Sequence, residues 1–345
     1  MTISAGTRRA PVPTVPPPWD SRSLGPKFQG LLLTIAAFAL LPAILATVMR
    51  VVPPTHDQAA QLAAFIPYGL IGYLLALGCL LLALVRSRHR LFLAVITVAV
   101  AALTALHLAW LAPLFINDHR VATSPEFSVM SLNMFNGEAD SREVAKRAAH
   151  ADIVILVETT PAALESLQSL GWHKRFPYSV GDPKDGSFNT AIYSRFPLSH
   201  STSIAGTTFQ QWSTTVRVPH VGSIRLMGVH PCNPYCGGDR WTAEHEILRE
   251  AVIDNLDHPL IVAGDFNAVD DHGPMLALRR IGLRTATDVA GAGWLPTYQS
   301  NGRLPPLLPI DHVMINKELT ATAVSSFAIS GTDHRGLLAS LARAY

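Results

Sequence analysis

Three long stretches without a charged residue lie in the first third of this chain of 345 residues. They span residues 30–49, 58–85 and 91–117, with 20, 28 and 27 residues. Because an α-helix rises ~1.5 Å per residue, each stretch is long enough to cross a hydrocarbon core of ~30 Å. We therefore expect three transmembrane helices within residues 28–117. A buried helix of a soluble domain is the alternative for the first stretch, which is the shortest and contains Pro42.

Charged residues around these stretches indicate an orientation. Residues 1–119 carry 8 Lys+Arg and 3 Asp+Glu, net +5, whereas residues 120–345 carry 19 and 22, net −3. Basic residues gather before the first stretch and between the second and third, and cytoplasmic flanks are enriched in such residues: Arg8, Arg9, Arg22, Lys27, Arg86, Arg88 and Arg90. We expect a disordered, Pro-rich cytoplasmic tail over residues 1–27. After three crossings, residues 118–345 are expected outside the cytoplasm.

Three cysteines exclude a scaffold built on many disulfides. Cys79 lies in the second uncharged stretch, and Cys232 and Cys236 form a close pair in the larger, later part of the chain. In an oxidising compartment this pair favours a disulfide. The rival interpretation is a metal site that also uses His230, but no fourth ligand is evident nearby. The sequence leaves the redox state of the pair open.

Residues 118–345 alternate between two kinds of pattern, which predicts a mixed α and β domain. Short apolar or alternating runs, several rich in Val and Ile, predict strands at 127–132, 152–157, 190–194, 223–229, 260–263, 310–315, 320–329 and 337–341. The stretches between them predict helices near 141–150, 161–170, 241–256 and 274–280.

Polar residues stand at the ends of most of these expected strands. Alone, an Asn or Asp after a strand is typical of a turn, and a single His is usually structural. Together they suggest that side chains far apart in the sequence meet at one edge of the sheets. The residues are Asn133, Glu158, His230, Asp265, Asn267, Asp311, Asp333 and His334. His312, beside Asp311, is expected to face the other side of its strand.

An ordered set of short motifs carries these residues: Ser-Leu-Asn at 131–133, Val-Glu at 157–158, Asn-Thr-Ala-Ile-Tyr-Ser-Arg at 189–195, Val-His-Pro at 229–231, Gly-Asp-Phe-Asn at 264–267, Ile-Asp-His-Val at 310–313 and Thr-Asp-His at 332–334. The set resembles the endonuclease/exonuclease/phosphatase superfamily. The resemblance implies an α+β, four-layer αββα sandwich of the DNase I type over residues 118–345. Three preceding helices and the Thr297-Tyr298 pair resemble membrane-anchored bacterial members of the YafD and VanJ type.

The resemblance also implies roles for the site residues. Glu158 is expected to bind Mg²⁺ or Mn²⁺, because such hard cations prefer carboxylate oxygens; Asn133 and Asp333 would complete the metal region. Asp265 would orient or deprotonate the attacking water, and Asn267 would hold a phosphoryl oxygen. The two histidines, His230 and His334, would contact the phosphate, with Asp311 fixing the His334 tautomer. Whether Asp265 or His334 is the base stays open, as do the number of metals and the role of Asn136.

The expected function is metal-dependent hydrolysis of a phosphoester at the outer face of a bacterial cytoplasmic membrane. A lipid-linked phosphate or pyrophosphate is the first substrate to test, because a tether keeps the site close to the bilayer. An extracytoplasmic Mg²⁺-dependent nuclease is the alternative. Nucleic acid is the less favoured partner, because the outer part has net charge −3 and no stripe of Lys and Arg interleaved with aromatic residues. A non-catalytic receptor for a phosphorylated ligand is the third hypothesis. Protein partners and oligomeric state stay open.

Overall fold

The computed structural model describes residues 26–85, 87, 89–300, 302 and 304–344. In these residues the later part of the chain forms two six-stranded sheets. The first has the order β11 (Leu319–Ala328), β12 (Arg335–Arg343), β1 (Phe127–Asn133), β2 (Ile153–Val157), β4 (Thr190–Ser194) and β3 (Tyr178–Val180). The second has the order β5 (Leu198–Ser203), β6 (Trp212–Val218), β7 (Gly222–Val229), β8 (Leu260–Asp265), β10 (Asp311–Ile315) and β9 (Arg284–Thr285).

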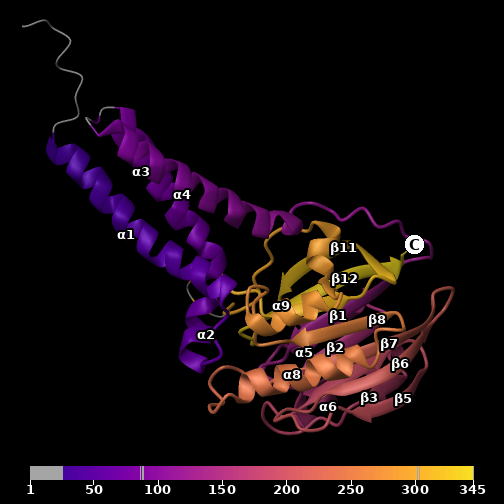
Figure 1. Cartoon of the computed structure of the whole chain (residues 1–345). Coiled ribbons are helices and arrows are strands. Elements are labelled where there is room, and N and C mark those ends of the chain that lie inside the picture. The colour runs from indigo at the N-terminus through magenta and orange to yellow at the C-terminus, as the bar shows by residue number, and fades with distance from the viewer. Residues whose placement is uncertain (1–25, 86, 88, 301, 303, 345) are drawn as a thin grey trace, which may run out of the picture.

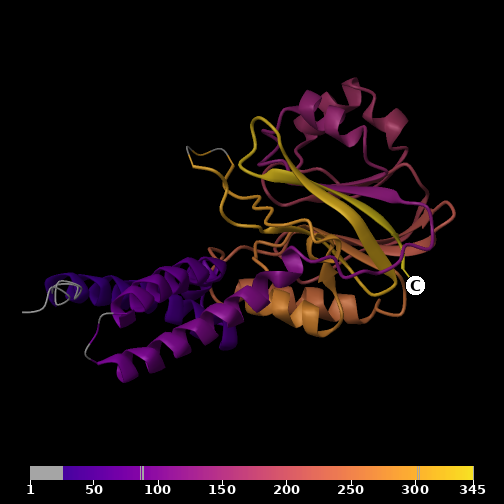
Figure 2. The ribbon, with the colours of Figure 1, turned by 90° about the horizontal axis from the view of Figure 1, so that it is seen from above.

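Helices cover the outer face of each sheet, as the view from above shows (Figure 2). The first sheet carries α5 (Ser141–Ala148), α6 (Pro161–Ser169) and α7 (Trp172–Arg175), whereas the second carries α8 (Arg240–Ile253) and α9 (Gly273–Arg280). A short helix, α10 (Ala286–Ala290), packs between β10 and β11. The expected α+β fold with αββα layers is therefore confirmed.

Alternation along the strands builds this sandwich. In β1, Val129 joins the core between the two sheets, whereas Met130 and Leu132 face the helices on the outside. Strands buried on both faces read as continuous apolar runs, which is why β1, β2 and β8 are visible in the sequence. Strands β5 and β6 are rich in Ser and Thr, and β5 is mostly exposed, so their pattern is weak.

The amino-terminal part forms a bundle that extends away from the sheets (Figure 1). Its long helices are α1 (Pro26–Val51), α3 (Gly69–Val85) and α4 (Arg90–Leu111). Among the described residues, three stretches are helical, long and apolar enough to cross a membrane: Lys27–Val51, Ile66–Val85 and Arg90–Leu114. Small residues let the helices approach closely; a Cβ on Gly72 would lie 2.6 Å from the Ala39 carbonyl oxygen. The predicted tail over 1–27 lies outside the described residues, apart from its last two.

The second uncharged stretch is not the single helix that we expected over residues 58–85. It begins with a short helix, α2 (Asp57–Ala63), continues through a 3₁₀ turn at η2 (Ile66–Tyr68), and only then enters α3. Pro67 lies in that turn and has no N–H for an α-helical hydrogen bond. Ala60 of α2 packs fully buried among side chains of β7, β8, α8 and α9. Tertiary packing thus attaches α2 to the sandwich through Ala60, while Ala63 packs against Ala46 of α1.

Polar contacts also join the bundle to the sandwich. Arg50, in the last turn of α1, forms an ion pair with Asp271, with 2.5 Å between Nε and Oδ1, and its guanidinium lies 5.2 Å from the Trp110 ring centroid. After α4, a 3₁₀ turn at η3 (Ala112–Leu114) accepts a hydrogen bond from the Gly293 N–H. The carboxyl-terminal ends of α1 and α4 are thereby fixed to the sandwich, at Asp271 after β8 and at Gly293 after α10.

Candidate active site

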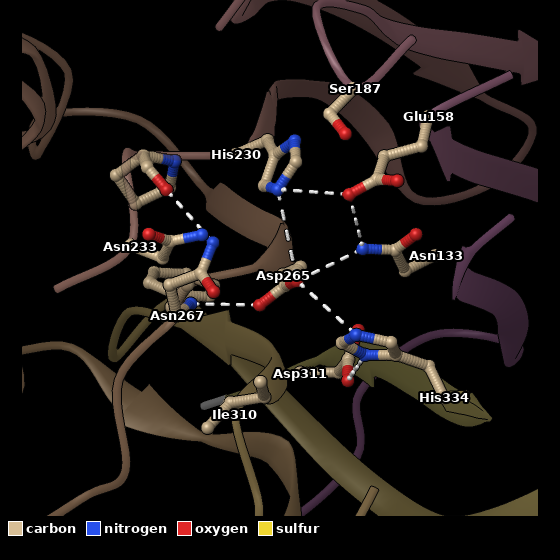
Figure 3. A network of polar contacts seen from close by, with 12 residues as sticks. Asn133, Glu158, Ser187, His230, Asn233, Asp265, Asn267, Ile310, Asp311 and His334 are labelled. Atoms are coloured by element: carbon tan, nitrogen blue, oxygen red, sulfur yellow. Dashed lines mark hydrogen bonds and ion pairs between the residues drawn. The ribbon is translucent and has the colours of Figure 1, made fainter. Parts of the chain in front are cut away.

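Strand register explains why the expected polar residues meet. In the parallel pair β1–β2, Asn133 is level with Val157, so Glu158 follows directly beside it. In the parallel pair β7–β8, Val229 is level with Gly264, which places His230 next to Asp265. The antiparallel pair β8–β10 sets Asp311 opposite Asp265. Both sheets therefore deliver their polar ends to one edge, and the side chains point toward a common centre (Figure 3).

Asn133 bridges the two sheets at this centre. Its Nδ2 donates to Glu158 Oε1 at 3.1 Å and to Asp265 Oδ2 at 3.0 Å. Its oxygen accepts from the Phe135 N–H at 2.8 Å, and because a backbone N–H only donates, the atom facing it is the oxygen. In the structure Asn133 presents its nitrogen to the two carboxylates and positions Glu158 and Asp265. Its expected place in the metal region stays a prediction.

Glu158 is held in one orientation by two donors. Besides the Asn133 amide, the Asn136 N–H donates to Glu158 Oε2 at 2.9 Å. Glu158 itself has a φ of 58°, in the left-handed region that few non-glycine residues adopt. This backbone conformation directs the Glu158 carboxylate away from strand β2 and into the cavity. The role of Asn136, which the sequence left open, includes this contact and a hydrogen bond from Ser187 to its side chain.

His334 and Asp311 form the expected pair. His334 Nδ1 lies 2.8 Å from Asp311 Oδ2, and its Nε2 lies 3.7 Å from Asp265 Oδ2. Burial disfavours the charged imidazolium, but the carboxylates of Asp311 and Asp265 outweigh this effect and raise the pKa of His334 to about 10. Burial, reinforced by Asp311, raises the pKa of Asp265 to about 6. The resulting site combines a cationic imidazolium with a carboxylate that titrates near neutrality.

His230 lies on the opposite side of Asp265 from His334 (Figure 3). Its Nε2 is 3.8 Å from both Asp265 Oδ2 and Glu158 Oε1, and its ring stacks on Phe209 with 4.5 Å between centroids. Asn267 reaches the same cavity, but its Nδ2 already donates to the Pro231 carbonyl at 3.1 Å. The contact that we expected from Asn267 to a phosphoryl oxygen therefore falls to its second N–H.

Asp333 is buried beside the site, and its Oδ1 has no hydrogen-bond partner. Burial raises the pKa of Asp333, and Glu158 and Asp311 contribute to the increase. This Asp333 oxygen lies 3.8 Å from His334 Nε2 but accepts no hydrogen bond, and with Glu158 nearby it fits a divalent cation that would neutralise both carboxylates. Glu158 and Asp333 thus suit Mg²⁺ or Mn²⁺ as oxygen ligands.

A second group of potential ligands lies close by. One ligand atom from each of Asp265, Asp311 and His334 falls within 4.8 Å of the others, and all three residues are buried. This cluster could also hold a metal. We favour the side of Glu158 and Asp333, because Asp311 and His334 already bind each other through Oδ2 and Nδ1.

Three aromatic N–H groups position the loop after β8, and the sequence analysis did not identify this role. Trp241 Nε1 donates to the Asn267 carbonyl at 3.1 Å, His245 Nε2 lies 3.0 Å from the Phe266 carbonyl, and His312 Nε2 lies 2.9 Å from the Ala268 carbonyl. His312 faces away from Asp311, as expected. Side-chain hydrogen bonds therefore fix three successive carbonyls, at residues 266–268, of the loop after β8, which we call the catalytic loop.

These residues open into a cavity of about 700 Å³. Its polar part contains the site residues, and its rim includes Asn233, Pro234 and Tyr235 from the loop that a disulfide between Cys232 and Cys236 closes. The wall that faces the bundle comes from α2 and the residues after it, which sequence reasoning had assigned to a membrane span. Ser187 and Phe209 also line the cavity, although no motif singled them out.

Comparisons with known proteins agree with this geometry. The profile of the Endonuclease/Exonuclease/phosphatase family matches residues 130–334, which include every candidate site residue from Asn133 to His334. The chain belongs to this family. Members of the endonuclease/exonuclease/phosphatase superfamily hydrolyse phosphoesters and generally use a divalent metal. A comparison with curated proteins found no match in sequence.

Solved structures of the endonuclease/exonuclease/phosphatase fold resemble the sandwich. An endonuclease/exonuclease/phosphatase from Beutenbergia cavernae is 20% identical and has a TM-score of 0.50. The match covers 64% of this chain and 72% of the Beutenbergia chain. A functionally unknown conserved protein from Enterococcus faecalis is 13% identical, covers 63% and 99%, and has a TM-score of 0.51. At these identities the likeness shows the fold alone.

Proposed function

We propose that the protein is a metal-dependent phosphoesterase that acts at a membrane surface, with a lipid-linked phosphate or pyrophosphate as substrate. The observation that carries the proposal is the buried set of Asp265, His334 and Glu158, which meets at the bottom of one cavity beside three candidate membrane helices. A tethered site meets lipid-borne phosphates at high effective concentration.

The side chains support attack of water on phosphorus. Asp265 accepts the proton of the attacking water, and its pKa of about 6 suits a base near neutral pH. His334 Nε2 and His230 Nε2 donate to the phosphoryl oxygens, where negative charge grows during the reaction. Glu158 and Asp333 would hold Mg²⁺ or Mn²⁺, which stabilises that charge when bound. Asp311 keeps His334 charged and oriented.

Lining residues argue against nucleic acid as the main substrate. Among the described residues that line the cavity, none is Lys or Arg. Proteins that bind DNA without sequence preference neutralise several phosphates with such residues. A small or lipid-borne phosphate needs only the few donors at the bottom of this cavity.

The test is phosphate release by the purified full chain in detergent with Mg²⁺, from lipid pyrophosphate, lipid monophosphate, a soluble phosphodiester and plasmid DNA. We expect turnover of the lipid substrates, and Asp265→Asn should lower kcat by ~10²–10⁴-fold because the general base is lost. Asp257→Asn, an exposed carboxylate in the turn before β8, is the matched control and should leave kcat unchanged. Nicking of plasmid without lipid turnover would establish the nuclease instead, and full activity of Asp265→Asn would remove Asp265 from its role.

A further inference from the structure

Helix α2 and the residues after it form one wall of the catalytic cavity. Gln58, Gln61, Leu62, Ala64 and Phe65 all line it, on the side that faces the bundle. These residues belong to an uncharged stretch between two candidate membrane spans, yet they border the same space as Asp265 and His334. The membrane-associated part of the chain therefore contributes directly to the substrate site.

Buried contacts fix this wall to the catalytic loop. The Val269 N–H donates to His272 Nδ1 at 3.0 Å, so the hydrogen of the neutral ring is on Nε2, which donates to the Ala60 carbonyl of α2 at 2.9 Å. Burial lowers the pKa of His272 to about 4, which keeps this bridge neutral at physiological pH. Ala64 packs on Val269 and Ile310. The wall thus has a defined distance from the loop that carries Asp265.

Two large apolar side chains of this wall stay open to solvent. Leu62 is 60% exposed and Phe65 is 46% exposed. Leu308 and Tyr298 line the same cavity and pack against the cluster that contains Ala64, and the Tyr298 ring lies 4.9 Å from that of His334. Exposed apolar residues that border a catalytic cavity mark a surface for an apolar ligand.

An apolar path leads from the catalytic residues toward the bundle. A second hollow of about 410 Å³ shares Phe65, Tyr298 and Leu308 with the first, and Leu307 extends it. The candidate membrane span Ile66–Val85 begins one residue after Phe65. A ligand whose phosphate lies beside His334 could therefore run its hydrocarbon chain past Phe65 to the surface of the bilayer.

We propose that Leu62 and Phe65 bind the hydrocarbon chain next to the phosphate, and that this contact makes the enzyme select phosphoesters with long chains over short, water-soluble ones. This inference rests on the proposed function and adds its specificity-determining residues. Each methylene of the chain that leaves water at this wall strengthens binding, so selectivity should grow with chain length. Removing the apolar side chains should remove that growth.

The experiment compares two prenyl pyrophosphates that differ only in length, geranylgeranyl and dimethylallyl pyrophosphate, with the full chain in a fixed amount of detergent. Phosphate release gives kcat/KM for each. We expect a higher value for the long chain, and Leu62→Gln or Phe65→Gln should lower the long-to-short ratio by about tenfold, mainly through KM. Leu62→Met keeps an apolar side chain at this position and should therefore keep the wild-type long-to-short ratio.

Leu170→Gln is the control, because Leu170 is a similarly exposed leucine, 45% accessible, at the end of α6. It should keep the wild-type ratio. A ratio near one in the wild type, or an equal ratio in all variants, would overturn the inference while leaving the phosphoesterase intact. Release of phosphate from neither compound, nor from any other lipid phosphate, would remove the proposed function and the inference with it.

Discussion

Single residues of the site acquire their chemistry from their neighbours. Asp265, with a pKa of about 6, and His334, with a pKa of about 10, lie 3.7 Å apart in a buried cavity. Between these values the carboxylate is charged and able to accept a proton, while the imidazolium is charged and able to donate to a phosphate. Neither state follows from the residue types alone, because burial and Asp311 set both pKa values.

We expect kcat/KM to be bell-shaped in pH. It should rise through about pH 6 as Asp265 loses its proton and fall through about pH 10 as His334 loses its charge. Bound Mg²⁺ adds positive charge near Asp265 and moves the acidic limb to lower pH. Replacing Asp311 by Asn removes the carboxylate that keeps His334 charged, so the alkaline limb should move to lower pH. Rates measured from pH 4.5 to 10.5 test this, and an alkaline limb that Asp311→Asn leaves in place would contradict it.

At the scale of helices and strands, α8 and β10 support the site by binding the loop after β8. Asp265 ends β8 and Asn267 lies in the loop that follows. Side chains of α8 and β10 bind the carbonyls of this loop: Trp241, His245 and His312. Burial lowers the pKa of His245 to about 3, so its ring is neutral and donates through one nitrogen. A loop so held keeps Asp265 at a fixed position, which catalysis by a positioned base requires.

The neutral His245 predicts acid sensitivity of the fold. Its pKa is about 3 in the folded state against 6.5 in the unfolded chain, so the unfolded state takes up the proton first and the contribution to stability is lost between these values as pH falls. From pH 7 to pH 5 the free energy of unfolding should drop by about 2 kcal/mol from this residue.

Urea unfolding followed by tryptophan fluorescence measures this drop in the full chain in detergent. His245→Gln keeps a side-chain N–H for the Phe266 carbonyl but cannot be protonated, so its stability should be lower at pH 7 and less dependent on pH. His173→Gln, which removes an exposed histidine of α7, should keep the wild-type pH dependence. An equal drop in wild type and His245→Gln would show that other groups cause the acid sensitivity.

For the whole molecule, the bundle and the sandwich are parts of one site. Arg50 of α1 pairs with Asp271, and His272 binds the Ala60 carbonyl of α2. On the sandwich side, Asp271 and His272 both belong to the loop between β8 and α9, so the bundle also supports the wall of the cavity. If the bundle spans a membrane, this arrangement holds the cavity within reach of the lipid surface.

We expect residues 118–345 to lie outside the cytoplasm, because basic residues flank the spans on the opposite side. An alkaline phosphatase fused after Tyr345 should then be active in intact cells, since that enzyme needs an oxidising compartment to form its disulfides. A fusion placed in the turn between α3 and α4 should be inactive. Activity of the turn fusion, with an inactive fusion after Tyr345, would reverse the orientation and move the substrate to the cytoplasmic face.

The sequence by itself predicted the central strands and the polar residues that meet at their ends, whereas the αββα layers were expected from the resemblance to the family. Apolar or alternating runs predicted β1, β2, β8 and β10 to within two residues at each end. The polar residues that follow the first three runs, and Asp311 within the last, predicted which side chains would meet. This succeeds because burial demands apolar residues along a strand, and parallel neighbours bring their ends to the same edge.

Only the tertiary structure decided what surrounds these residues. Hydropathy cannot distinguish an apolar helix in lipid from one against a protein core. The sequence therefore predicts α2 as part of a membrane span, whereas in the structure Ala60 of α2 is buried beside β8. Hydrogen bonding, not residue type, turned the Asn133 nitrogen toward the carboxylates and set the ring N–H groups of α8 on the catalytic loop. Such contacts join residues more than a hundred positions apart or on different elements, and they depend on distances that no local pattern encodes.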